Sequence, residues 1–118
     1  MKFLFTIYHE ERVLDALPDG EMQSLVDSAL DYSDELRRSG HYIASNALQR
    51  PRTARTIRVR DGKVSTTDGP FAETKEQLGG FFLIEAKDMD EACAIASRFP
   101  PARVGTIEVR AVRELEHS

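Results

Sequence analysis

Asp61 and Gly62 join two short runs of alternating polar and apolar residues. An Asp-Gly pair between such runs is typical of a β-hairpin closed by a two-residue turn, because both turn residues adopt positive φ. A loop of this length fixes the strand register, so counting outward from the turn places Arg55 opposite Asp68. Side chains alternate along a strand, and these two therefore share a face with the apolar residues of the hairpin, Ile57, Val59 and Val64.

The rest of the chain shows two helical patterns and four strand patterns. Apolar residues recur at helical spacing in two segments, and shorter apolar runs indicate strands. The expected elements are strand 2–8, helix 21–39, strand 41–48, strand 80–86, helix 88–99 and strand 105–112. Without the hairpin this order is β-α-β-β-α-β, the split βαβ arrangement of ferredoxin-like folds. The sequence predicts an α+β fold, a ferredoxin-like core with an inserted β-hairpin, and a polar loop over 9–20.

Length and composition favour one globular domain spanning residues 1–118. The single cysteine, Cys93, excludes an internal disulfide and favours a reducing compartment, so we expect a cytoplasmic protein. Its position near an apolar helical stripe predicts a buried thiol. The apolar run at residues 3–8 is too short to span a bilayer, and we expect no membrane association. A formal net charge of −4 gives no reason to expect a nucleic-acid partner.

Residues 67–82 form an unusual connection, T-D-G-P-F-A-E-T-K-E-Q-L-G-G-F-F. Gly69 frees the backbone and Pro70 fixes φ. Thr74 and Gln77 have the spacing of a capping box, which predicts a single helical turn after the hairpin. The run D-G-P-F-A-E-T-K-E closely resembles the signature of the YCII-related family, specifically its DGPF-domain branch, and the resemblance extends from the first strand to Val109.

The resemblance implies a ferredoxin-like fold that pairs as a dimeric α/β barrel. Relatives in that superfamily catalyse isomerisation, lyase and oxygen chemistry on small ring compounds, often without a cofactor. The implied partners are therefore a second copy and a small-molecule ligand, and no cofactor is expected. The sequence favours the same homodimer independently, because helices cover one sheet face while strand 80–86 is apolar on both faces. DGPF-domain proteins are often encoded beside extracytoplasmic-function sigma factors, so the alternative function is a non-catalytic accessory protein.

Asp68 is the candidate catalytic residue, as a general base or polar anchor in a pocket at the sheet edge. Arg55 would orient it or bind an anionic group of the substrate. The other candidate substrate-binding residues are Tyr8, Ser45, Gly69, Pro70 and Phe71. A purely structural interpretation remains open, in which the ion pair locks the hairpin base and Phe71 plugs the core. The residues do not decide between an enzyme and a binding protein.

Histidines give little support to a second site. Some YCII-related proteins carry a pocket His-Asp pair whose histidine lies on the first helix, and segment 21–39 contains no histidine. His9, Glu10 and Glu11 are adjacent on the chain and lack further ligands at suitable spacing, so no metal is expected. Several arginines between residues 50 and 60 make the hairpin basic. They indicate either a docking surface or protection of an edge strand.

Overall fold

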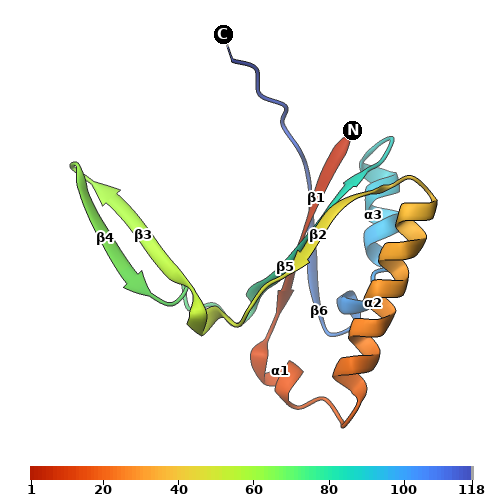
Figure 1. The fold of residues 1–118 in the computed structure, drawn as a ribbon, viewed down its shortest axis with the longest axis horizontal. Helices are drawn as coiled ribbons and strands as arrows, with labels where there is room; N and C mark the ends of the chain where they lie inside the picture. The colour runs from red at the N-terminus through yellow and green to blue at the C-terminus, as the bar shows by residue number, and fades with distance from the viewer. Residues whose placement is uncertain (118) are drawn as a thin grey trace.

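The computed structural model describes residues 1–117 and shows an antiparallel four-stranded sheet with two helices on one face (Figure 1). The strand order is β2-β5-β1-β6. The elements of this layer pair are β1 (Lys2–His9), α2 (Glu21–Arg38), β2 (Tyr42–Ala47), β5 (Gln77–Glu85), α3 (Met89–Ser97) and β6 (Gly105–Ala111). The predicted α+β, ferredoxin-like fold is confirmed, with β5 as a central strand. No helix among residues 1–117 is long and apolar enough to cross a membrane.

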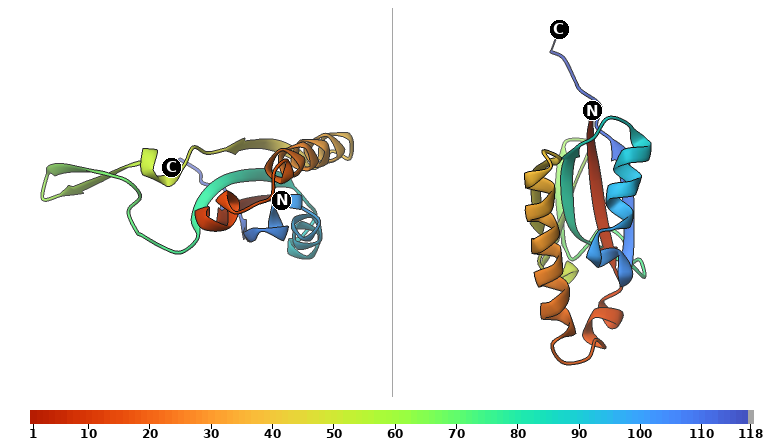
Figure 2. Two further views of the ribbon diagram at one scale, coloured as in Figure 1. Left: turned by 90° about the horizontal axis from the view of Figure 1, so that it is seen from below. Right: turned by 90° about the vertical axis from the view of Figure 1, so that its right-hand side faces the viewer.

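The inserted hairpin consists of β3 (Arg55–Arg60) and β4 (Lys63–Asp68) and pairs in the predicted register. Arg55 lies opposite Asp68, and φ is positive at both turn residues, 52° at Asp61 and 74° at Gly62. The short helix η1 (Pro51–Thr53) leads into the hairpin. The hairpin extends away from the sheet on the side opposite α2 and α3 (Figure 2).

The core lies between the sheet and the two helices. Phe3 and Phe5 of β1 are fully buried. The rings of Phe82 and Phe99 meet edge to face, with centroids 4.3 Å apart. Tyr32 of α2 is buried against the same cluster and donates a hydrogen bond of 2.8 Å to the carbonyl of Ile95 on α3. Edge-to-face aromatic pairs contribute about 0.5–1.5 kcal/mol beyond area burial, so this cluster ties both helices to the sheet.

Three local predictions were wrong. Residues 9–20 contain a short helix, α1 (Glu11–Asp15), where Val13 and Leu14 donate to the Glu10 carbonyl. The stretch after Thr74 forms no helical turn, because Gln77 starts β5 opposite His9 and its side chain donates to the Ala72 carbonyl. Cys93 is exposed, since it follows the buried Ala92 by one position and a helix turns about 100° per residue.

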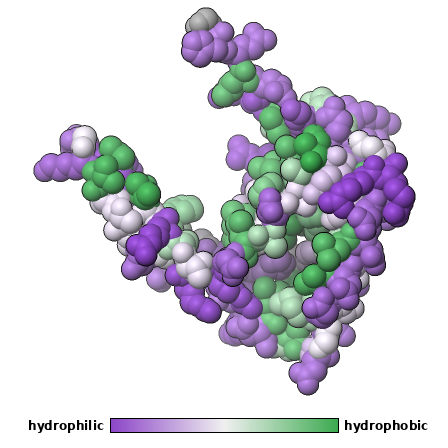
Figure 3. Space-filling model, in the orientation of Figure 1, coloured by the Kyte–Doolittle hydropathy of each residue, from purple (hydrophilic) through white to green (hydrophobic). Residues whose placement is uncertain are grey.

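Among residues 1–117, no helix covers the second face of the sheet. Leu4 and Thr6 of β1 and Phe81 and Leu83 of β5 alternate with the buried core residues and so point away from the helices. The apolar residues of the hairpin are also uncovered, with exposed fractions of 65% for Ile57 and 68% for Val64. The space-filling view shows apolar surface on the hairpin and a wide gap between it and the body (Figure 3).

Candidate functional site

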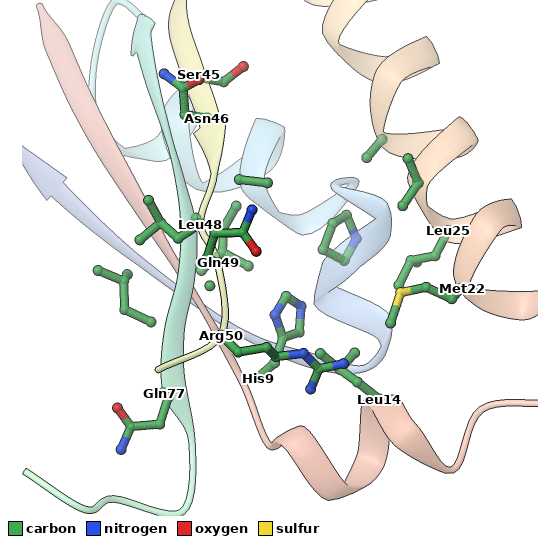
Figure 4. Close-up of a pocket in the computed structure, with 18 of the residues that line it drawn as sticks. His9, Leu14, Met22, Leu25, Ser45, Asn46, Leu48, Gln49, Arg50 and Gln77 are labelled. Carbon is green, nitrogen blue, oxygen red and sulfur yellow. The ribbon is translucent and has the colours of Figure 1, made fainter. Parts of the chain in front are cut away.

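A pocket of about 360 Å³ lies between the N-terminal half of α2 and the sheet (Figure 4). This volume lies within the range of small-molecule sites. One wall comes from the two N-terminal helices and the other from the sheet and the segment after β2. The apolar lining includes Leu14, Met22, Leu25, Val26, Ala29, Leu48 and Phe82.

The pocket exists because the sheet offers little side-chain volume beneath this part of α2. Gly79 and Gly80 of β5 have no side chain, and Ser45 and Ala47 of β2 are small. Gly79 also forms a bulge, since Ile7 pairs with Gly80 and the next residue of β1 pairs with Leu78. The apolar residues along one side of α2 therefore pack tightly near the C-terminal end of the helix and face unfilled space near its N-terminal end.

His9 is the histidine of this pocket and comes from the last position of β1. Its ring lies between two glycines. A Cβ at Gly79 would lie 2.8 Å from the ring Nδ1, and one at Gly105 would lie 2.7 Å from Cδ2. The Nε2 atom is buried without a hydrogen-bond partner in residues 1–117. Burial lowers the pKa of His9 below its ordinary 6.5, while the carboxylate of Glu76 acts to raise it and Arg50 to lower it. The imidazole is therefore mainly neutral at pH 7.

Arg50 crosses from the segment after β2 to α1. Its guanidinium donates a 3.0 Å hydrogen bond to Oδ1 of Asp15 and lies 3.8 Å from a carboxylate oxygen of Glu11. The backbone before it is fixed by a 2.9 Å hydrogen bond from the Leu48 amide to the Gly79 carbonyl. In the close-up, Arg50 and His9 lie at the same end of the pocket, beside Leu14 of α1 (Figure 4). This end is polar, and the α2 side is apolar.

Glu76 does not line the pocket, but its charge acts on the pKa of His9. It precedes β5, is half-buried, and accepts hydrogen bonds of 2.9 and 3.0 Å from the Thr106 hydroxyl through its two carboxylate oxygens. The hydroxyl holds the carboxylate in place. Glu76 can therefore stabilise a positive charge on His9 without moving.

Residues 1–116 match the model of the YCII-related domain. The chain belongs to the YCII-related family. A solved structure of similar fold is a 5-chloro-2-hydroxyhydroquinone dehydrochlorinase from Burkholderia phenoliruptrix AC1100, in complex with 2,5-dihydroxybenzoquinone. It is 18% identical with a TM-score of 0.50, and the match covers 96% of this chain and 94% of that one.

A second relative of this YCII-related chain is an uncharacterized protein of Rhizobium meliloti (strain 1021). The two sequences are 48% identical over 59 residues, which is 48% of this chain and 48% of the relative. The match thus spans about half the length of the curated relative.

The predicted site residues of the YCII-related chain lie in three different places. Ser45 lines the pocket, where its hydroxyl is 2.7 Å from that of Tyr42. Tyr8 precedes His9 on β1 and is not among the residues that line the pocket. Asp68, Gly69 and Pro70 border a shallow depression at the base of the hairpin.

Arg55 and Asp68 form the predicted ion pair, with 3.4 Å between nitrogen and oxygen and exposed fractions of 70% and 85%. An exposed pair of this kind contributes little to stability. Phe71 is 79% exposed, so it does not plug the core. The catalytic role of Asp68 stays a prediction.

The sequence-based interpretation missed the polar end of the pocket. His9 was considered only as a metal ligand. Alternation could have placed it, since Phe3, Phe5 and Ile7 point to the helix side and His9 is the next odd position. Arg50 had no comparable signal, because its role depends on the helix α1, which the sequence did not indicate.

Proposed function

We propose that the pocket beneath α2 binds a small organic molecule and that His9 exchanges a proton with it. The protein is then a cofactor-independent enzyme or a small-molecule-binding protein of the YCII-related type. The observation that carries the proposal is a half-buried histidine at the polar end of an otherwise apolar pocket, whose Nε2 has no hydrogen-bond partner among residues 1–117. A neutral imidazole can act as a general base at pH 7.

The size of the pocket suits a ring compound. Apolar walls would contact the faces of a ring, and the polar end would contact its substituents. The structural neighbour is described as an enzyme in complex with 2,5-dihydroxybenzoquinone, itself a ring compound. We take this likeness as a guide to ligand size, and the role of His9 rests on its own geometry.

A thermal-shift screen of small ring compounds tests the proposal. A ligand at 100 times its dissociation constant stabilises the protein by about 2.7 kcal/mol. Val26→Trp should fill the pocket and abolish the shift, because Val26 lines it. Val112→Trp is the matched control, since this valine lies outside the pocket and is 37% exposed. Equal shifts for both variants would contradict the proposal.

We also propose a homodimer in which a second copy lies on the open sheet face. The second copy would allow Asp68 to act in a binding site. The ion pair between Asp68 and Arg55 is exposed in the single chain, and it would lose its water once the second copy covers it. In a dimer whose ligand has been found, Asp68→Asn should then weaken binding or turnover by more than tenfold. The stability of the isolated chain, in which the pair is exposed, should change by only about 1 kcal/mol. If Asp68→Asn leaves ligand binding unchanged, the ion pair has only the structural role of holding the base of the hairpin together.

The accessory role remains the second candidate, and the exposed apolar residues of the hairpin favour it. Ile57, Val59 and Val64 present an uncovered face that a partner protein could contact. The resemblance to the DGPF branch suggests a sigma-factor system in the cytoplasm. Loss of partner binding in Val59→Lys, with ligand binding intact, would support this role.

A further inference from the structure

We propose that the β3–β4 hairpin is an arm that reaches across the dimer and closes the pocket of the partner subunit. This inference rests on the proposed homodimer and adds a site that neither chain completes alone. In this arrangement the apolar face of each hairpin lies on the exposed rim of the pocket beneath α2 of the other copy. Three properties of the chain lead to it: an uncovered hairpin, an uncovered pocket rim and opposite charges on the two surfaces.

The hairpin has little support from its own chain. Its side-chain hydrogen bonds and its ion pair within residues 1–117 join residues of the segment 55–69 to one another. Ile57, Val59 and Val64 are more than half exposed, and they share one face of the hairpin. A two-stranded hairpin is only marginally stable in water unless a further element covers its apolar face. An apolar surface on another molecule would supply this cover.

The rim of the pocket beneath α2 is such a surface. Leu30 of α2 lines the pocket and is 59% exposed. Leu48, which follows β2, and Leu78 of β5 line the opposite wall, and both are also exposed. Exposed leucines on both walls give the pocket an apolar mouth that is open to solvent. The three apolar side chains of a hairpin can contact both walls and exclude water from this mouth.

The two surfaces carry opposite charges. Residues 21–36 of α2 contain five carboxylates and neither lysine nor arginine. Asp27 lies one turn before Leu30 and Asp31 directly follows it, and both are exposed. Residues 55–63 of the hairpin contain four cations and one carboxylate. Because the hairpin extends away from the sheet on the side opposite α2, this attraction acts between two chains (Figure 2).

The cations of the hairpin act on α2 from the other face of the ribbon. Arg58, Arg60 and Lys63 alternate with the apolar residues and so lie opposite Val59. A ribbon is about 10 Å thick, the spacing of stacked sheets, and this does not exceed the screening length of about 10 Å at 0.1 M salt. The charges therefore guide the hairpin onto α2, and the apolar face makes the contact.

The hairpin is long enough to reach the pocket of a second copy. The longest dimension of the molecule is 50 Å and runs from the hairpin to α2 (Figure 1). Two sheets packed face to face lie about 10 Å apart, whereas a six-residue strand spans about 20 Å. A copy seated on the open sheet face therefore has the layer between its own sheet and helices within reach of the hairpin. A two-fold axis makes the exchange reciprocal and closes both pockets.

Disulfide trapping tests the contact directly. The single cysteine is first removed by Cys93→Ser. In that background, Val59→Cys combined with Leu30→Cys should give a disulfide-linked dimer with oxidised glutathione. Val59→Cys combined with Met89→Cys is the matched control, since Met89 is exposed on α3, away from the residues that line the pocket. The first variant should link at least about tenfold faster, because a disulfide requires Cα atoms within about 7 Å.

Charge reversal tests the attraction. Arg58→Glu with Arg60→Glu should raise the dissociation constant of the dimer at least about tenfold at low salt, because like charges then face each other. Asp27→Lys with Asp31→Lys should have the same effect for the same reason. All four substitutions together should restore most of the affinity, since opposite charges meet again with their signs exchanged. Losses that simply add, without this rescue, would count against the inference.

Sedimentation velocity separates the inference from the proposals on which it rests. A monomeric native protein would remove the homodimer and the arm together. A dimer in which Val59→Cys links to Leu83→Cys on the open sheet face, or to neither position, instead of to Leu30→Cys would keep the homodimer and overturn the arm. In each of these cases the pocket stands or falls by its own thermal-shift test, which does not need the hairpin.

Discussion

At the scale of single residues, two glycines determine where the His9 ring lies. Gly79 borders one edge of the ring through its bare Cα, and Gly105 borders the other. A Cβ at Gly79 would press only on the imidazole, which can rotate away. A Cβ at Gly105 would also collide with the backbone carbonyl oxygen of Tyr8, which cannot move without disturbing β1. The two positions therefore have different energetic consequences.

Gly105→Ala should lower the free energy of unfolding by about 1–3 kcal/mol, the usual cost of overpacking. Gly79→Ala should change it much less and should instead reduce ligand binding, because the ring is displaced. Urea unfolding of both variants, alone and combined with His9→Ala, measures the difference. The second mutation should relieve Gly79→Ala and not Gly105→Ala. Equal destabilisation by the two single variants would show that the ring is not what Gly79 accommodates.

The lowered pKa of His9 predicts how stability depends on pH. The unfolded chain binds a proton near pH 6.5, and the folded chain resists protonation to lower pH. The stability linked to His9 is therefore complete above about pH 6.5 and falls as the pH drops below it. Urea unfolding between about pH 7.5 and 5 should show a larger loss in the native protein than in His9→Gln. A steeper loss in the variant would mean that the pKa is raised instead.

At the scale of elements, α2 divides into two functional halves. Its C-terminal half closes on the core through Tyr32 and Leu36, which are 8% and 3% exposed. Its N-terminal half carries the same apolar stripe, yet Met22 and Val26 are 37% and 42% exposed at the pocket. One periodic pattern thus serves packing at one end and binding at the other.

Leu36→Ala should destabilise the fold by about 2–5 kcal/mol, as expected for a buried leucine. Leu25→Ala is the matched change in the pocket wall, where part of the side chain already faces empty space, and it should cost clearly less. Thermal unfolding of the pair checks this. If the two losses are equal, the pocket is closed in solution and α2 packs along its whole length.

The split in α2 also shows what the sequence could predict. Alternation and the Asp-Gly turn were enough for the strands and for the Arg55–Asp68 register, because both depend on local geometry. Helical periodicity gave the direction of the α2 stripe correctly. It could not show how closely each part of α2 packs against the sheet. That closeness depends on Gly79 and Gly80, which belong to a strand more than forty residues later in the chain. The polar end likewise depends on Arg50 meeting α1, a tertiary contact without a local pattern.

At the scale of the whole molecule, the hairpin makes the shape unusually open. The radius of gyration is 16.4 Å, whereas a compact chain of this length has about 13.5 Å. The open sheet face and the hairpin lie on the same side of the molecule, away from α2 and α3 (Figure 2). A second copy placed there would cover both apolar surfaces.

We therefore predict that sedimentation velocity at micromolar concentration shows a dimer. Leu83→Arg, which puts a charge on the open sheet face, should shift the protein towards monomer by more than tenfold in dissociation constant. Arg98→Glu provides a charge-changing control on the helix side. A monomeric native protein would contradict the proposed dimer.

The division of α2 has a consequence for how this protein can diversify. Most substitutions that alter a ligand site also threaten folding, because the same side chains contribute to both ligand binding and stability. Here the first two turns of α2 border empty volume while the last two hold the core. Variants at Met22, Leu25 and Val26 can therefore explore new ligands while the folded state stays above its stability threshold. This part of the helix is the natural place to randomise when the specificity of the pocket is to be changed in the laboratory.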